Sequence, residues 1–255
     1  MDAERFESAL WQTSSLLLAA DGEAVLVDPA ITREEVARIA ARAAELGLRV
    51  TAVLATHADW DHVCGIAAFP DAEAAMGERT ADFVESGAAA ERLETGAAEY
   101  GVEPCGPPRC DRRLATGLAH RVGPFVVEAL ALPGHTSDST GYRIRALDLL
   151  VVGDYLSPIE FPYVSWTAAY RATLAALIEL LRRDPPARVV VGHGPELGAA
   201  EALAIAEADL DYLWRLHDAV LAGGAEAGLA VEPPRGGDEE MRAVNVDTQL
   251  AELRP

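Results

Sequence analysis

Apolar runs and short polar breaks in the first quarter of the chain predict two strands, a helix and a third strand. Residues 16–20 and 24–27 are apolar and are joined by Asp21-Gly22, a dipeptide typical of a hairpin turn. A capping-box pattern precedes residues 33–46, whose apolar positions keep helical spacing. Residues 50–55 are continuously apolar, which favours a strand buried on both faces. This region is therefore predicted to be β-β-α-β.

In the remainder of the chain, predicted strands and helices again follow one another, over longer segments. An Ala/Glu-rich stretch, 80–100, is predicted to be helical and broken at Gly87 and Gly96, and Ser165 is predicted to cap a later helix. Further strands are predicted at 72–76, 125–132, 142–145, 147–152 and 188–191, and a long helix at 200–220. Because the strands come in two groups, each followed by helices, we expect two packed sheets with helices outside.

Length and charge narrow the class of protein. The chain has 255 residues, so we expect a single domain over 1–255, with a helical and loop insertion around 78–117 and a C-terminal helical segment at 200–255. The formal net charge of −20 repels phosphate backbones, which argues against a nucleic-acid partner. The sequence has neither a signal-peptide pattern nor an apolar run of the roughly 18 residues that span a membrane. We therefore expect a cytoplasmic protein with no membrane partner.

Imidazoles and carboxylates gather directly after four apolar strands. These segments are residues 56–62, 133–136, 153–154 and 192–194. They contain four of the chain's six histidines, and strand C-terminal ends are where ligands collect in sheet proteins. A lone histidine after a strand is more often structural, but His57, Asp59, Asp61 and His62 lie close together, and burying that many titratable groups without a metal is costly. The pattern therefore favours a site for zinc, iron or manganese.

In order and spacing, these segments resemble the metal motifs of the metallo-β-lactamase superfamily, whose first motif is His-x-His-x-Asp-His. The resemblance spans about 10–194 and implies that superfamily's fold: an α+β, four-layer αββα sandwich of two mixed sheets flanked by helices. It also implies a site for two divalent metal ions. In that site His57 and His135 hold the first metal, Asp61, His62 and His193 hold the second, and Asp154 bridges both.

Asp59 departs from the motif, because it stands where the superfamily usually has its second histidine. Flavodiiron proteins, a branch of the same superfamily, have glutamate there and bind iron. With Asp59 the ligand carboxylates and a bridging hydroxide carry −4, which balances two divalent cations and makes a harder site. We expect Asp59 to be a ligand, directly or through water, and zinc to be the metal ahead of iron or manganese. Occupancy by one metal instead of two stays open.

The resemblance implies hydrolysis by a metal-bound hydroxide, which a metal supplies by lowering the pKa of its water to about 7. Asp61 is then both a ligand and a proton acceptor. Asp28, at a strand end, is a candidate hydrogen-bond partner of a ligand histidine, with an ordinary turn residue as the alternative. Candidate substrate-pocket residues are Trp60, Tyr155, Tyr163 and Trp166.

The leading prediction is hydrolysis of an ester, thioester or lactone in a small organic molecule, by similarity to glyoxalase II-type and lactonase-type members. One alternative, prompted by Asp59, is a non-haem iron oxidoreductase of dioxygenase type. Another is a non-catalytic metal-binding module on the same fold. The expected partner is a small-molecule substrate, and a homodimer is left open.

Overall fold

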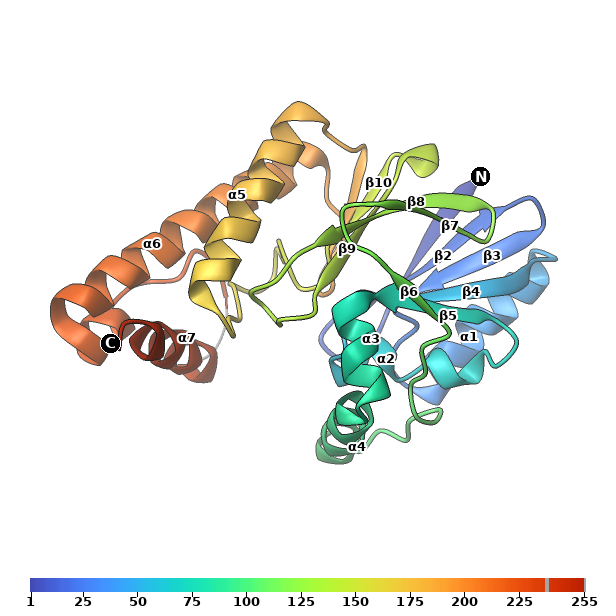
Figure 1. Cartoon of the computed structure of the whole chain (residues 1–255), viewed down its shortest axis with the longest axis horizontal. Coiled ribbons are helices and arrows are strands. Elements are labelled where there is room, and N and C mark those ends of the chain that lie inside the picture. The colour runs from blue at the N-terminus through green and yellow to red at the C-terminus, as the bar shows by residue number, and fades with distance from the viewer. Residues whose placement is uncertain (237–238, 255) are drawn as a thin grey trace.

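Two mixed β-sheets form the centre of the molecule in a computed structural model, which describes residues 1–236 and 239–254 (Figure 1). The first sheet has the order β1-β2-β3-β4-β5-β6 and comprises Asp2–Glu7, Ser14–Ala20, Glu23–Val27, Arg49–Ala55, Glu73–Gly77 and Arg112–Leu114. The second has the order β11-β10-β9-β8-β7. In chain order, β7 to β11 are Ala119–Val122, Phe125–Ala131, Thr140–Ile144, Leu149–Val151 and Arg188–Val190. Both sheets contain parallel and antiparallel pairs, as predicted.

Helices lie on the outer side of each sheet. The first half of the chain contributes α1 (Arg33–Glu45), α2 (Trp60–Val63), α3 (Glu78–Glu85) and α4 (Ala88–Glu99). The second half contributes α5 (Thr167–Arg183), α6 (Ala199–Leu229) and α7 (Glu239–Glu252), which lie together on the other side of the molecule (Figure 1). Short 3-10 turns span Ile66–Ala68 and Arg145–Leu147. This arrangement confirms the predicted αββα sandwich.

Three apolar layers stabilise the sandwich. Side chains such as Leu18 and Leu54 of the first sheet meet Phe125 and Tyr142 of the second, and all four are almost fully buried. A second layer packs α1 against the outer face of the first sheet, and a third packs α5 and α6 against the second sheet. Burial of this apolar area is the main favourable term in folding.

The hairpin and the first helix form as the sequence predicts. Asp21 and Gly22 both have left-handed backbone angles, with φ of 54° and 77°, which suits a two-residue hairpin turn. Thr32 and Glu35 make both hydrogen bonds of the capping box, and Gly47 (φ 67°) follows the end of α1.

The local structure differs from the prediction at one glycine, at one helix cap and at three strands, β1, β6 and β7, that the sequence did not predict. The edge strand β1 has no clear alternation and was not predicted, and it pairs antiparallel with β2. Gly96 does not break the helix. It lies inside α4, where the indole of Trp60 packs so closely that a side chain at Gly96 would collide with it. Ser165 does not cap α5, because the carboxylate of Glu252 in α7 accepts from the backbone N–H groups of Thr167 and Ala168.

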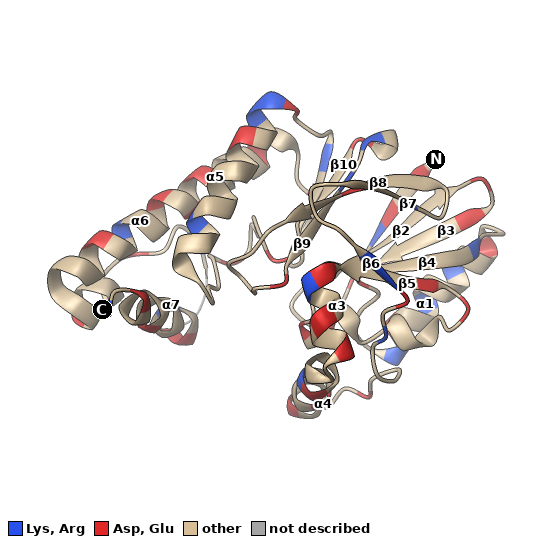
Figure 2. Cartoon of the chain, in the orientation of Figure 1, with Lys and Arg blue, Asp and Glu red and all other residues tan. Residues whose placement is uncertain are grey.

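The C-terminal helix packs on the same chain. Val246 of α7 is buried in the layer formed by α5 and α6, and Asn245 exchanges hydrogen bonds with the backbone of Pro162 and Val164. Acidic side chains are spread along the outer helices (Figure 2), as the net charge leads one to expect. Over residues 1–236 and 239–254, no helix is long and apolar enough to cross a membrane.

Candidate metal centre

Strand ends bring the predicted site residues to one edge of the sandwich. His57 follows β4, His135 lies in the loop after β8, Asp154 follows β10 and His193 follows β11. In the second sheet β8, β10 and β11 run in the same direction, since each of β8 and β10 is antiparallel to β9 and β11 is parallel to β10. The C-terminal ends of these three strands therefore lie at the same edge of the second sheet. The backbone N–H of Thr140 at this edge donates to the carbonyl of Thr56, which follows β4 of the first sheet.

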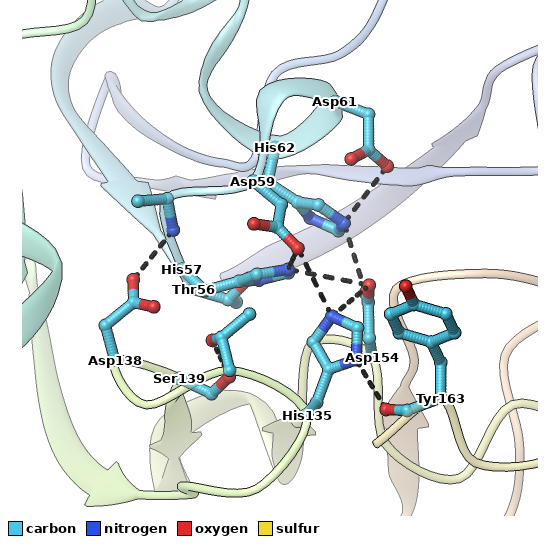
Figure 3. Close-up of polar contacts among 12 residues, drawn as sticks. Thr56, His57, Asp59, Asp61, His62, His135, Asp138, Ser139, Asp154 and Tyr163 are labelled. Atoms are coloured by element: carbon cyan, nitrogen blue, oxygen red, sulfur yellow. Dashed lines mark hydrogen bonds and ion pairs between the residues drawn. The ribbon is translucent and has the colours of Figure 1, made fainter. Parts of the chain in front are cut away.

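The side chains form two clusters and a third group that joins them, His57, His62 and Asp154, and within each of the three the potential metal-ligand atoms lie within 4.8 Å of one another. The first cluster is His57, Asp59 and His135, and the second cluster is Asp61, His62 and His193. Figure 3 shows His57, Asp59 and His135 of the first cluster and Asp61 and His62 of the second, with the carboxylate of Asp154 in contact with His57, His62 and His135. All seven residues that the sequence analysis singled out as ligands thus lie in one place.

Asp154 contacts the imidazoles of both clusters. Its Oδ2 atom lies 3.5 Å from Nε2 of His57, 3.1 Å from that of His135 and 3.2 Å from that of His193. Its Oδ1 atom lies 3.1 Å from Nε2 of His62. Gly192 makes this approach feasible, since a side chain there would collide with the carboxylate of Asp154.

Each of the four histidines has its Nδ1 atom occupied by a partner outside the clusters. The Nδ1 atoms of His57 and His62 lie 3.0 Å from Oγ1 of Thr56 and Oδ2 of Asp28, and that of His135 lies 3.0 Å from the carbonyl of Tyr163. Nδ1 of His193 lies 3.2 Å from the carbonyl of Trp11. An Nδ1–H that donates to an oxygen leaves the lone pair on Nε2, so all four Nε2 atoms are set up as acceptors that point into one space.

Several of these atoms are buried without a hydrogen-bond partner in the described chain. They are the Nε2 atoms of His57, His62 and His135 and Oδ1 of Asp154. Leaving such atoms unpaired costs roughly 1–3 kcal/mol each, more for charged groups. Convergent imidazole nitrogens and carboxylate oxygens are the donor set of a divalent transition metal, so the residues fit the ions that the sequence analysis expected.

In the metal-free protein the carboxylates raise the pKa values of the histidines. Burial opposes charging of His193, but Asp154 and Asp61 outweigh it and raise its pKa to about 9. Burial and neighbouring His62 likewise oppose charging of His57, whereas Asp154 and Asp59 raise its pKa to about 9. Burial would raise the pKa of Asp154, yet the surrounding imidazoles hold it well below its usual value. Such strongly shifted groups cluster at functional sites.

Asp28 makes the contact that the sequence analysis proposed for it. Its Oδ2 atom accepts from Nδ1 of His62 and, at 2.6 Å, from the hydroxyl of Thr56. Thr56 in turn accepts from His57, so one buried carboxylate orients a histidine of each cluster. Its position is fixed further by the backbone N–H of Thr56, at 2.8 Å.

Asp59 has a partner that sequence analysis missed. Its Oδ2 atom faces the Nε2 atoms of His57 and His135, at 3.6 and 3.5 Å, and its Oδ1 atom accepts from Nη1 of Arg92 at 2.8 Å. Arg92 lies in α4, 33 residues away along the chain. No sequence pattern links Arg92 to the motif, since the contact depends on how α4 packs over α2.

The four candidate pocket residues lie in different surroundings. Trp60 is nearly buried under α4 and lines one side of a cavity of about 600 Å³ beside Asp59. Tyr155 is fully buried behind His135, where its hydroxyl donates to the carbonyl of Pro133 and accepts from the backbone N–H of His135. Tyr163 is 42% exposed and its ring lies 6.0 Å from that of His135. Trp166 is exposed and lines a separate cavity of about 430 Å³.

Two further aromatic residues at the mouth were not predicted. Trp11 and Tyr100 line the cavity beside Asp59, and their rings form an edge-on pair 4.6 Å apart. Trp11 also lies 6.3 Å from the ring of His193 in the second cluster. Trp11 follows the unpredicted strand β1, which is why sequence analysis gave no signal for it.

Comparison with known families decides the identity of the fold. A family model described as the metallo-beta-lactamase superfamily matches residues 9–193, from the loop before β2 to His193. The chain belongs to this superfamily. The match contains every residue of both clusters and Asp154, which confirms the resemblance seen in the sequence.

Relatives within the superfamily include named hydrolases. A probable metallo-hydrolase, YqgX of Bacillus subtilis, is 26% identical over 190 residues, which cover 72% of this chain and 86% of that protein. A hydroxyacylglutathione hydrolase of Cereibacter sphaeroides is 33% identical over 138 residues. That similarity covers 54% of this chain and 45% of the hydrolase, so the chain matches about half of that enzyme's length.

Solved structures of the superfamily share the fold. A metallo-beta-lactamase family protein of Thermus thermophilus has a TM-score of 0.73 at 22% identity, and the match covers 98% of this chain and 92% of that one. A protein solved in a di-iron-bound form, TTHA1623, has a TM-score of 0.62 at 24% identity, covering 78% of this chain and 96% of its own. At this identity the likeness shows the metallo-β-lactamase fold alone.

Proposed function

We propose that this chain is a metal-dependent hydrolase that cleaves an ester, thioester or lactone bond of a small organic substrate. The observation that carries the proposal is the convergence of four imidazole Nε2 atoms and three carboxylates on one space. The Nδ1 atom of each of these imidazoles has a hydrogen-bond partner outside the clusters. The superfamily membership and the two hydrolase relatives support hydrolysis as the reaction.

The proposed ligand sets follow the two clusters. His57, Asp59 and His135 would hold one divalent cation, Asp61, His62 and His193 would hold the other, and Asp154 lies close enough to both clusters to serve either. When bound, such cations polarise a carbonyl oxygen and lower the pKa of water near neutrality. The carboxylate of Asp59 makes the first cluster a harder ligand set than a third histidine there would, so iron and manganese follow zinc closely as candidate metals.

The protein's own residues hold the ligands and handle the proton. Asp28 and the carbonyls of Tyr163 and Trp11 fix the imidazoles, which removes the reorganisation that loose ligands would require. Asp61 is the proposed proton acceptor. Its Oδ2 atom lies 3.3 Å from the hydroxyl of Thr13, which holds the carboxylate beside the reacting centre.

The substrate's apolar part is proposed to lie in the cavity beside Asp59. Trp11, Trp60 and Tyr100 supply aromatic walls, and Asp59 places the cavity next to the first cluster. Its volume of about 600 Å³ is of the size that takes a small organic molecule. A thioester substrate agrees with the relative named for hydrolysis of hydroxyacylglutathione.

Metal analysis beside a substrate panel tests the proposal. Protein purified without added metal is analysed for zinc, iron and manganese, and turnover is measured on an aryl ester, an acyl thioester and a lactone. We expect about two metal ions per chain and turnover of at least one substrate, with both lost in the Asp154→Ala variant. Protein that binds no metal, or that turns over none of the substrates when fully loaded, would contradict the proposal.

One observation favours a second candidate, a non-haem iron oxidoreductase. The carboxylate of Asp59 faces two imidazoles in the first cluster, and a protein of the same fold has been solved with two irons bound. Stoichiometric iron together with consumption of oxygen, and no turnover of the ester panel, would select this function instead.

A further inference from the structure

Asp59 is divided between the first cluster and a helix outside the metal motif. Its Oδ2 atom points to His57 and His135, and its Oδ1 atom accepts from the guanidinium of Arg92 at 2.8 Å. The two oxygens of one carboxylate thus have separate partners. Among the residues that the structure describes, Arg92 is the one outside the cluster whose side chain donates a hydrogen bond to Asp59.

The rest of the protein gives Asp59 little support. Asp59 is the N-cap residue of α2, but its side chain makes no capping hydrogen bond. The side chain of Asp59 is 30% exposed, whereas the other proposed ligands are at most 8% exposed. A carboxylate at this rim can turn toward water unless a partner fixes it, because exposed side chains change rotamer freely.

Arg92 is itself held in place. Its guanidinium stacks over the ring of Phe83 in α3, 4.8 Å from the ring centroid. Helix α4 is in turn fixed over α2, since the indole of Trp60 packs against Gly96. The insertion therefore presents the guanidinium from a defined position rather than from a free loop.

We propose that Arg92 is a positioning residue that holds Asp59 so that a single carboxylate oxygen faces the first cluster. The inference rests on the proposed function only in that the clusters bind a divalent metal. It assigns a role to the helical insertion: α3 and α4 complete the first metal subsite from outside the motif.

Two effects of Arg92 on metal binding oppose each other. Its positive charge repels a nearby cation, and its hydrogen bond orders a ligand for that cation. The Arg92 side chain is 43% exposed, so solvent and salt screen its charge, whereas the hydrogen bond acts at a fixed 2.8 Å. Ordering therefore outweighs repulsion, and removal of Arg92 weakens metal binding.

Zinc binding to a set of variants tests the proposal. Metal-free wild type, Arg92→Ala, Arg92→Gln and Arg92→Lys are titrated with Zn²⁺ in competition with a chromophoric chelator. Arg113→Ala is the matched control, because Arg113 is also 43% exposed and pairs with Asp82 and Glu85 of α3. Circular dichroism verifies that each variant is folded.

We expect Arg92→Ala to weaken one of the two zinc affinities by about tenfold, the lower end of what loss of a ligand's hydrogen-bond partner costs. The other affinity, and both affinities of Arg113→Ala, stay at the wild-type value. Arg92→Lys should keep most of the affinity, and Arg92→Gln should lie between lysine and alanine, because it retains a donor without the charge.

Unchanged or tighter zinc binding in folded Arg92→Ala would overturn the inference, as would an equal loss at both subsites. Failure of the proposed function has a different signature, since wild type itself would then bind no zinc. If Arg92→Ala does not fold, the comparison of Arg92→Gln with Arg92→Lys decides, and equal zinc affinities in those two variants and wild type would likewise overturn the inference.

Discussion

The two clusters are built in different ways, although they face each other across one carboxylate. In the second cluster, Asp61, His62 and His193 are all buried and are fixed by residues of the sandwich itself, among them Thr13 and Asp28. In the first cluster, Asp59 is partly exposed and accepts a hydrogen bond from an arginine of the insertion. The second cluster is therefore supported from within the sandwich, whereas the first is contacted by a helix of the insertion.

This contrast predicts that the proposed second subsite binds metal more tightly. A ligand that is already ordered loses less conformational freedom when the cation binds. Three substitutions test this contrast, and a change of pH tests what the two clusters share.

The largest effect is expected from Asp154→Ala, which should remove the contrast by damaging both subsites. Asp154 contacts all four imidazoles, and without it the clusters lose their common oxygen ligand. We expect loss of most bound metal and a fall in kcat/KM of at least about 10³-fold, since metal stabilisation of the transition state is worth several kcal/mol. Elemental analysis and steady-state kinetics measure this, and retention of both metals would show that the site is arranged differently.

Asp28→Asn should act mainly on the second subsite. The carboxylate accepts directly from Nδ1 of His62 but reaches His57 only through the hydroxyl of Thr56. We expect about 10- to 100-fold weaker zinc binding at the second subsite, as for other hydrogen-bond partners of ligand histidines, and a smaller loss at the first. Chelator competition measures both affinities. A larger loss at the first subsite would reverse the comparison.

Asp59→His should make the first subsite independent of the insertion. A histidine restores the usual motif of the superfamily and gives Arg92 no carboxylate to hold. We therefore expect the Arg92→Ala substitution, which weakens zinc about tenfold in the wild type, to have no further effect in the Asp59→His background. A double-mutant cycle on zinc affinity measures the coupling, and equal effects of Arg92→Ala in both backgrounds would mean that Arg92 does not act through Asp59.

Residues close in sequence made much of the fold and the site predictable. The hairpin at Asp21 and Gly22 and the helix cap at Thr32 depend on neighbouring residues alone, so local patterns sufficed. The convergence of His57, His135 and His193 followed from strand ends meeting at one edge. Their assignment as metal ligands stays a proposal.

What could not be predicted depends on contacts between distant segments. Arg92 meets Asp59 only because Gly96 accepts the indole of Trp60, and the sequence suggested that Gly96 ends the helix. Glu252 caps a helix that begins 85 residues earlier. Neither contact leaves a periodic pattern, so each requires the packed structure.

The smallest expected effect is that of pH on metal-free protein, and it should affect both clusters alike. Burial lowers the pKa of His57 and of His193, and neighbouring His62 also lowers that of His57. The carboxylates outweigh these effects and raise both pKa values to about 9, above the roughly 6.5 of a histidine in an unfolded chain. A histidine with a raised pKa stabilises the fold below the unfolded value and loses that contribution as pH rises through the folded value. The thermal midpoint of chelator-treated protein should therefore fall between about pH 6.5 and 9. Zinc binds the deprotonated imidazoles, so the rise in thermal midpoint that zinc produces should grow over the same pH range.

A thermal midpoint of the metal-free protein that rose with pH would contradict this prediction. It would mean that the carboxylates do not raise the pKa values of the histidines in the two clusters.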